Sequence, residues 1–190
     1  FLTANKHLKG GSEYTEIDHP LQRAIRAATE EVTGESVAGY GIDGCSAPNF
    51  AMSVAGLARA MGAFAAAREG GNSRQRAMAR LRDAMAAHPD LVAGEGRACT
   101  ELMRAMGGKV SIKTGAEAVF VAMLPEQKLG IALKIEDGDD KRARAVISVE
   151  VLRQLGIFDE NTLTNISPLP IKNRRGETVG RVEASFNLKF

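Results

Sequence analysis

The chain has 190 residues, of which 44% are hydrophobic and 25% charged, and its formal net charge is +2. This composition is typical of a soluble globular protein. The small net charge argues against a strongly basic nucleic-acid-binding surface. No apolar run in the sequence approaches the roughly 20 residues that span a bilayer. The chain shows no signal-peptide pattern, and two cysteines do not make a disulfide scaffold. We therefore expect a cytoplasmic protein with reduced thiols that binds neither nucleic acid nor a membrane.

The first half of the chain predicts helices separated by glycine-rich turns. Pro20 suits the first turn of a helix, where its missing N–H costs nothing, and Gly34 stops the apolar run that follows. Ser73 is expected to cap a later helix. The expected helices cover residues 20–33, 50–68, 74–87 and 98–106. A row of arginines in the third of them indicates a solvated helix face: Arg74, Arg76, Arg80 and Arg82.

Residues 40–49 are dense in glycine, proline, aspartate and asparagine, which predicts a loop. Such a loop can bring backbone amides to a ligand. The alternative is a turn in which Asp43 and Ser46 cap their own backbone. Cys45 is either a metal ligand or a structural thiol, and the lack of a second cysteine or histidine at ligand spacing favours the structural role.

The second half of the chain predicts strands. Two apolar runs, residues 116–124 and 129–135, flank a turn and indicate a hairpin. A helix over 141–155 and two short strands over 169–173 and 179–183 follow. We expect a single α/β domain over residues 1–190, helix-rich first and strand-rich second.

Lys113-Thr114-Gly115 stands directly before this hairpin. Such a motif, followed by strands and a helix, matches the third motif of serine acyl-transfer enzymes of the penicillin-binding type. A lysine at that strand edge would be partly desolvated, which suits proton transfer; the alternative is an exposed strand-end lysine. Cys99 lies 14 residues earlier, on the helix that feeds this strand, so we expect it nearby, in a packing role by residue type alone.

A serine acyl enzyme of this type also needs Ser-x-x-Lys to carry its nucleophile and base. No Ser-x-x-Lys occurs in the 190 residues, and Ser111 stands two positions before Lys113, which is the wrong spacing for one helix face. Residues 1–11 read as the end of a helix that closes on glycine, without a preceding cap. We therefore expect the nucleophile upstream, on an N-terminal part that is missing.

Several short sequence segments resemble segments of the bacterial L-asparaginase II family, of the rhizobial, class 3 type, and occur in the same order. They are residues 40–48 (YGIDGCSAP), 88–94 (HPDLVAG), 100–103 (TELM) and 113–120 (KTGAEAVF). The chain resembles the C-terminal portion of that family over nearly its whole length. The resemblance implies a β-lactamase/glutaminase-like α/β (α+β) fold with an antiparallel sheet, and hydrolysis of L-asparagine to aspartate and ammonia in asparagine catabolism.

The resemblance also implies roles for individual residues. Lys113 is similar to the strand lysine of the family's serine–lysine active site, and Asp43 to an aspartate that helps to hold substrate. Cys45 is similar to a cysteine that binds zinc, whose other ligands would lie upstream. The expected substrate-binding residues are Asp43, Gly44, Cys99, Thr114 and Gly115. No cofactor is expected to be required for the chemistry, with zinc at Cys45 as the candidate metal.

The implied mechanism is acyl transfer, in which a lysine-activated serine attacks the side-chain amide and water releases aspartate. Two alternatives remain open. One is another amidohydrolase on the same scaffold, such as a glutaminase or a β-lactam hydrolase. The other is a catalytically incomplete binding or assembly fragment. We expect residues 1–190 alone to be inactive and the parent enzyme to be a homodimer.

Overall fold

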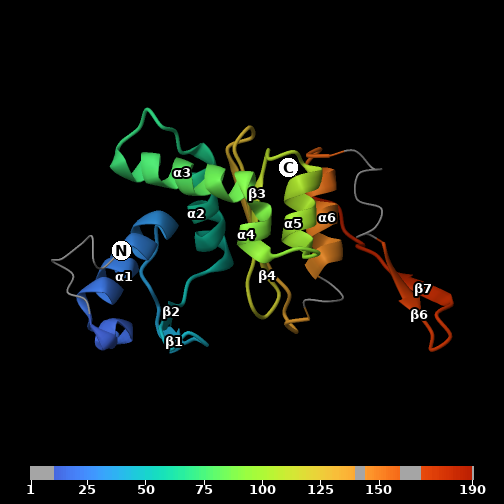
Figure 1. Ribbon diagram of the computed structural model, residues 1–190, viewed down its shortest axis with the longest axis horizontal. Helices are drawn as coiled ribbons and strands as arrows, with labels where there is room; N and C mark the ends of the chain where they lie inside the picture. Colours follow the sequence, from blue (N-terminus) through green and yellow to red (C-terminus); the bar gives the residue numbers. More distant parts are fainter. Residues whose placement is uncertain (1–10, 140–143, 159–167, 190) are drawn as a thin grey trace. The chain divides into compact units, whose positions relative to one another are not determined.

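The computed structural model describes residues 11–139, 144–158 and 168–189 (Figure 1). The chain divides into two compact units, residues 1–60 and 61–190, and the boundary falls within helix α2 (Val54–Ala66). Helices and small antiparallel sheets are mixed along the chain, so the α/β class is confirmed. The single domain over residues 1–190 and the β-lactamase-like arrangement stay predictions. The helix end expected near residues 1–11 lies almost wholly outside the described residues.

The first unit is built around helix α1. Its elements are η2 (Ser12–Thr15), α1 (Pro20–Thr33), β1 (Tyr40–Ile42), β2 (Pro48–Phe50) and the first half of α2. Helix α1 begins and ends as predicted. His19 Nδ1 accepts a hydrogen bond from the backbone N–H of Leu21 at 3.1 Å, which caps the start. Gly34 closes the helix with φ 67°, a left-handed conformation that glycine adopts without a steric penalty.

The loop expected over residues 40–49 is instead a short antiparallel hairpin, with Tyr40 opposite Phe50. Phe50, the last residue of β2, was expected to begin a helix. The helix starts later, at Val54, where the Ser53 hydroxyl accepts a hydrogen bond from the N–H of Gly56 at 2.8 Å. This bond satisfies one of the backbone donors that every helix N-terminus leaves without an intrahelical partner.

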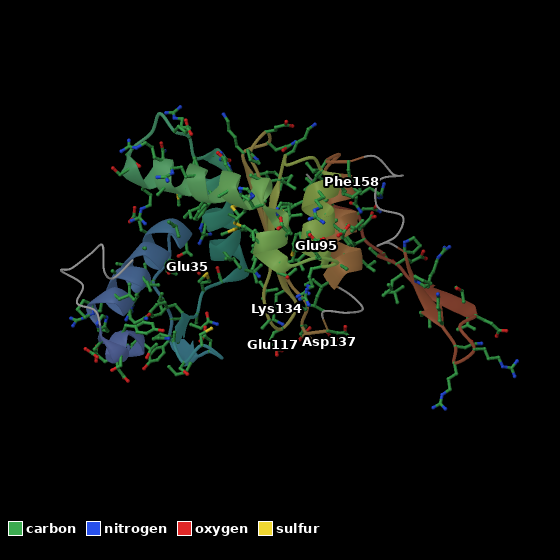
Figure 2. The ribbon with its side chains drawn as sticks, viewed as in Figure 1. Glu35, Glu95, Glu117, Lys134, Asp137 and Phe158 are labelled. Carbon is green, nitrogen blue, oxygen red and sulfur yellow. The ribbon has the colours of Figure 1, made fainter. Side chains whose placement is uncertain are left out.

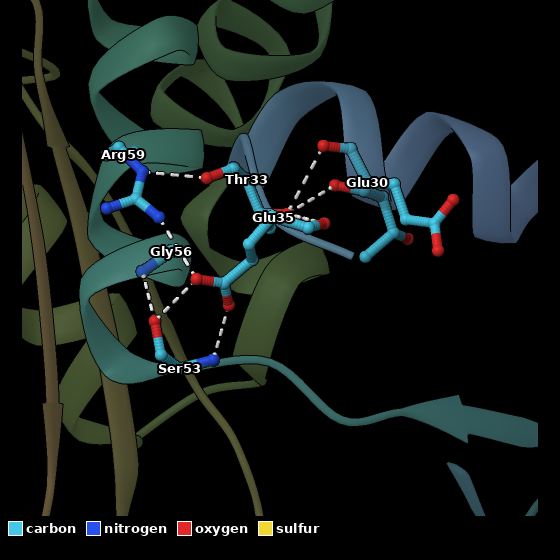
Figure 3. Close-up of polar contacts among 7 residues, drawn as sticks. Glu30, Thr33, Glu35, Ser53, Gly56 and Arg59 are labelled. Atoms are coloured by element: carbon cyan, nitrogen blue, oxygen red, sulfur yellow. Dashed lines mark hydrogen bonds and ion pairs between the residues drawn. The ribbon is translucent and has the colours of Figure 1, made fainter. Parts of the chain in front are cut away.

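Glu35 joins the end of α1 to the start of α2 (Figure 3). Its Oε1 accepts from the Ser53 backbone N–H at 2.6 Å, and its Oε2 accepts from the Ser53 hydroxyl at 2.8 Å. The Arg59 guanidinium donates to Oε2 at 3.0 Å and to the Thr33 carbonyl at 2.7 Å. The Ser53 backbone bond, then the Ser53 hydroxyl and Arg59, lower the pKa of the Glu35 carboxyl.

We expect this contact to make the first unit sensitive to acid. Because the folded state lowers the Glu35 pKa, its contribution is complete above the ordinary glutamate pKa of about 4.3 and is lost as the pH falls through the lowered value. Glu35→Gln should therefore reduce stability at pH 7 and flatten the melting-temperature profile between pH 3 and 5. Thermal unfolding across that range tests this, with Glu16→Gln, an exposed glutamate of the same unit, as the control. Parallel profiles for wild type and Glu35→Gln would contradict it.

The second unit contains a three-stranded antiparallel sheet in the order β3 (Ser111–Thr114), β4 (Val119–Leu124) and β5 (Leu129–Lys134). This confirms the predicted hairpin, although β4 begins three residues later than expected. One face of the sheet packs against helices α5 (Ala98–Ala105) and α6 (Ala145–Gln154), which lie side by side in Figure 1. The shared core consists of Cys99, Leu102, Met103, Met106, Val110, Ile112, Phe120, Ala122, Leu124, Val149 and Leu152.

Helix α3 (Ser73–Ala87) and the paired strands β6 (Leu169–Lys172) and β7 (Thr178–Val182) follow the sequence prediction with small changes. The short helix α4 (Pro89–Ala93) was not among the helices expected from the sequence. Ser73 was expected to cap α3, but Asn72 does so, its Oδ1 accepting from the Gln75 N–H at 2.9 Å. The start expected for the helix over 141–155 falls on residues outside the described ranges.

Arg82 overturns the expectation of a solvated arginine face on α3. Its side chain is buried, and Nη1 donates to the backbone carbonyls of Phe64, Ala65 and Ala67 at 2.9–3.0 Å. These carbonyls lie at the end of α2, where the last turn has no intrahelical partners and carries partial negative charge. The Arg82 carbonyl in turn accepts from the Ser111 hydroxyl at 2.7 Å. One residue thus links α2, α3 and β3 within the second unit.

Candidate active site

The Lys113-Thr114-Gly115 segment forms the end of β3 and the start of the turn that follows. Successive residues of a strand point to opposite faces of the sheet. Lys113 lies opposite Val121 in the neighbouring strand, whereas Thr114 lies opposite Phe120, a member of the α5–α6 core. The two polar side chains therefore lie on opposite faces of the sheet. Thr114 lies on the face that packs against the α5–α6 core, and Lys113 lies on the other face.

On the core side, Cys99 and Thr114 are brought together as the sequence led us to expect. Cys99 is 2% exposed, and its thiol donates to the Thr114 hydroxyl oxygen at a S···O distance of 3.4 Å. The backbone of the next residue is also held, because Arg144 Nη1 donates to the Gly115 carbonyl at 2.9 Å. The thiol thus acts in packing and in orienting Thr114.

Arg144 is a residue that the sequence prediction missed. It is 9% exposed and stands immediately before α6. A cation at a helix N-terminus is disfavoured by the helix dipole, so an arginine there indicates a partner elsewhere. The basic run over residues 141–144 carried that signal, but the identity of the acceptor, a carbonyl 29 residues earlier, depends on tertiary structure.

Lys113 is exposed, which corrects the expectation that it would be partly desolvated. Its Nζ donates to the Thr114 carbonyl at 2.7 Å. The strand-edge position explains the exposure, since Lys113 lies near the end of β3 on the face that α5 and α6 do not cover. An exposed ammonium is accessible to a substrate, and any desolvation would have to come from what binds there.

The turn after this segment is strained. Glu117 and Ala118 both have positive φ, 54° and 55°, and the Val119 N–H bonds to the Ala116 carbonyl at 3.3 Å. Positive φ at both central residues is the mark of a type I′ turn, which favours Asn-Gly. Figure 2 shows Glu117 near Lys134 and Asp137. Unfavourable backbone conformations of this kind cluster at functional sites, so the turn strengthens the candidacy of the adjacent motif.

Relieving this strain should stabilise the protein. Glu117→Asn places a residue that tolerates the left-handed conformation at an exposed position, and we expect it to raise the free energy of unfolding by about 0.5–1 kcal/mol. Denaturant unfolding measures the change. Glu126→Asn, an exposed glutamate of the next turn at which no positive φ is found, is the matched control. A loss of stability in Glu117→Asn would show that contacts of the glutamate side chain stabilise the fold by more than its unfavourable backbone conformation destabilises it.

Asp43, Gly44 and Cys45 lie in the turn between β1 and β2, in the first unit. The Asp43 Oδ1 accepts hydrogen bonds from the backbone N–H groups of Cys45 at 2.8 Å and Ala47 at 3.2 Å. Asp43 therefore caps its own turn, the alternative that the sequence left open. A Cβ added at Gly44 would meet no atom within 4 Å, so this position is open.

Cys45 is an exposed free thiol. Within residues 11–139, 144–158 and 168–189, no group of three or more histidine, cysteine, aspartate or glutamate side chains could hold a metal ion. The described residues thus do not by themselves fit the zinc site that the resemblance implies, and no step is derived through a metal. None of the helices in these ranges is both long enough and apolar enough to span a membrane.

The comparison with protein-family models identifies the family to which this chain belongs. A family model for L-asparaginase II matches residues 1–184. The chain belongs to the L-asparaginase II family. No curated protein matches it. Membership of the L-asparaginase II family makes the chain part of an amidohydrolase of the asparaginase type, with a small-molecule substrate as its partner.

Proposed function

We propose that the chain forms part of an enzyme that hydrolyses L-asparagine to L-aspartate and ammonia by serine–lysine acyl transfer. The observation that carries this proposal is the L-asparaginase II match over residues 1–184. The strand-borne Lys113-Thr114-Gly115 segment supports it, because this motif accompanies a serine nucleophile in acyl-transfer enzymes. The nucleophile is proposed to come from sequence outside residues 1–190, which contain no Ser-x-x-Lys.

In this proposal Lys113 is the electrostatic or proton-transfer partner of the serine. Its exposed ammonium can stabilise negative charge that develops when the serine attacks the amide. Thr114 and Gly115 are the proposed substrate-binding residues beside it, and their positions are fixed by Cys99, which bonds to the Thr114 hydroxyl, and by Arg144, which bonds to the Gly115 carbonyl. Asp43, with Gly44 open beside it, is the proposed anchor for the substrate α-ammonium.

We further propose that the enzyme is cytoplasmic and homodimeric. Zinc binding at Cys45 would require ligands beyond the described residues. The chemistry proposed for Lys113 and Asp43 needs no metal.

The test is the intact mass of the purified parent protein combined with ammonia release from L-asparagine on the same sample. The proposal expects activity in a protein heavier than 20.2 kDa, one that carries Ser-x-x-Lys, and no activity in residues 1–190 alone. Activity at 20.2 kDa would overturn the placement of the nucleophile. An inactive parent would favour the binding or assembly fragment.

Substrate choice is tested separately, by running L-glutamine and a β-lactam beside L-asparagine. Faster turnover of either alternative would replace asparagine as the substrate while leaving the acyl-transfer mechanism intact. Competition between the substrates in one reaction then measures the ratio of their kcat/KM values directly.

A further inference from the structure

A basic pocket of about 370 Å³ lies in the second unit, where the end of α2, helix α3 and the turn between β4 and β5 meet. This volume falls within the range of small-molecule sites, about 300–1,000 Å³. Among the described residues that line it, three are cationic and none is acidic. The cations are Arg68, Arg82 and Lys128, and Gln75 adds a neutral amide.

Arg82 is the buried member of this lining, with 8% of its surface exposed. Its Nη1 donates to the three carbonyls at the end of α2, and its Nε donates to the Asp83 carboxylate at 2.8 Å. The other terminal nitrogen, Nη2, has two N–H groups and donates to no acceptor within the part of the chain that the structure describes. Nη2 is therefore the group that Arg82 can offer to a ligand, and an acceptor there would satisfy a largely buried donor.

Arg68 and Lys128 bring two further cations to the same pocket from separate elements. Both are exposed, and neither forms an ion pair with a carboxylate of residues 11–139, 144–158 or 168–189. Asp83, the acid that pairs with Arg82, does not line the pocket and balances one charge of the three. Like charges that converge in this way repel one another, so a bound anion would remove an unfavourable interaction.

The end of α2 also borders this pocket, and a helix C-terminus carries partial negative charge. Here that charge is already compensated, because Arg82 Nη1 donates to the carbonyls of the last turn. The terminus therefore does not oppose an anion in the pocket.

A phosphate group fits these donors better than a carboxylate does. Guanidinium groups bind phosphate oxygens through paired N–H donors, and a lysine ammonium adds a point charge. Phosphate offers more acceptor oxygens and carries up to two negative charges, against three cations and the Gln75 amide. The volume leaves room for a small organic group beside the phosphate.

We propose that this pocket binds the phosphate group of a small molecule, held by Arg82 Nη2 with Arg68 and Lys128. The site lies at the end of the sheet away from the Lys113 motif. Thr114 pairs with Phe120, near the start of β4, whereas the turn that borders the pocket follows the end of that strand. The proposal is independent of the proposed hydrolysis, because it uses other residues and its test measures binding without turnover.

The first experiment titrates inorganic phosphate and glycerol 3-phosphate into the full chain at low salt and follows the heat of binding. Each should bind at one site, and glycerol, which lacks the phosphate, should give no binding heat. Binding of inorganic phosphate alone would support the site and assign it to the free anion, whereas binding of glycerol 3-phosphate alone would assign it to a phosphate monoester. Absence of binding by both would overturn the proposal.

The second experiment removes the exposed cations one at a time. Arg68→Met and Lys128→Met should each weaken binding of the better probe roughly tenfold. Arg80→Met removes the same charge from α3, but Arg80 is exposed and lines a different pocket beside Glu69 and Asp83. That control should bind as wild type does. An equal loss in all three variants would mean that net charge alone governs binding, which would overturn the site.

The third experiment tests the buried guanidinium. Arg82→Lys keeps the charge but loses the second terminal nitrogen, so the probe should bind at least tenfold more weakly. Wild type should also melt at a higher temperature with saturating probe, because the ligand binds the folded state. This shift should vanish in the Arg68→Met/Lys128→Met double variant, which alters only exposed side chains and should fold even if Arg82→Lys does not. Wild-type affinity in a folded Arg82→Lys, or an undiminished shift in the double variant, would refute the proposal.

Discussion

Replacement of Lys113 by methionine is expected to lower asparagine turnover of the complete enzyme by roughly two to four orders of magnitude. Methionine keeps most of the side-chain length but removes the ammonium. Because Lys113 is exposed at the end of β3 and supports no core contact, the fold should survive the change. The loss should therefore appear in kcat, measured as ammonia release, with an unchanged circular dichroism spectrum.

Lys134 provides a closely matched control. Like Lys113 it is an exposed strand lysine whose Nζ donates to the carbonyl of the next residue, at 2.5 Å compared with 2.7 Å. Lys134→Met should retain wild-type turnover. If Lys113→Met retained it as well, the lysine would have no part in the chemistry and the motif would be a structural strand end.

Arg82→Met is expected to destabilise the second unit by about 3 kcal/mol, because it leaves three carbonyls at the end of α2 without their donor. In a chain of this size the melting temperature should fall by roughly 10 °C. Thermal or denaturant unfolding measures the loss. The accompanying ion pair with Asp83, at 2.8 Å, is half in solvent and contributes little.

Arg80 lies on the same helix but is exposed, so Arg80→Met makes the same chemical change without a buried partner. We expect that variant to lie within about 0.5 kcal/mol of wild type. Equal losses in the two variants would mean that helix propensity, and not the contact with α2, determines the effect. Arg82→Lys should recover part of the stability, since one ammonium can still reach a carbonyl.

Elements with strong local signals were predictable from the sequence. Pro20 marks the start of α1 and Gly34 marks its end, because the proline ring fixes its own φ and glycine readily adopts a positive φ. Both effects are local and can be read from the sequence. The β4–β5 hairpin followed from two apolar runs around a turn, in which Lys128 adopts a φ of 52°. The proximity of Cys99 to Thr114 also followed, because a short connection leads from α5 into β3.

The features that the sequence did not predict share a physical cause: each depends on contacts with residues that are distant in the sequence. Strands β1 and β2 have three residues each, too few for alternation to show, and they form because Tyr40 pairs with Phe50. Arg82 lies in the same arginine-rich stretch of α3 as its exposed neighbours. It differs from them because its side chain reaches the carbonyls at the end of α2. Arg144 likewise bonds to a carbonyl that no local pattern indicates.

The division of Lys113 and Thr114 between two faces of β3 limits how the chain can change in length. The connection from α5 to β3 spans residues 106–110. Met106 and Val110, at its two ends, belong to the core, so only residues 107–109 can change in number without opening that core. A deletion that reached the strand and shifted its register by one residue would turn the lysine charge into the core occupied by Phe120 and Leu124. Insertions confined to residues 107–109 should therefore be tolerated, whereas removal of Val110 should abolish folding.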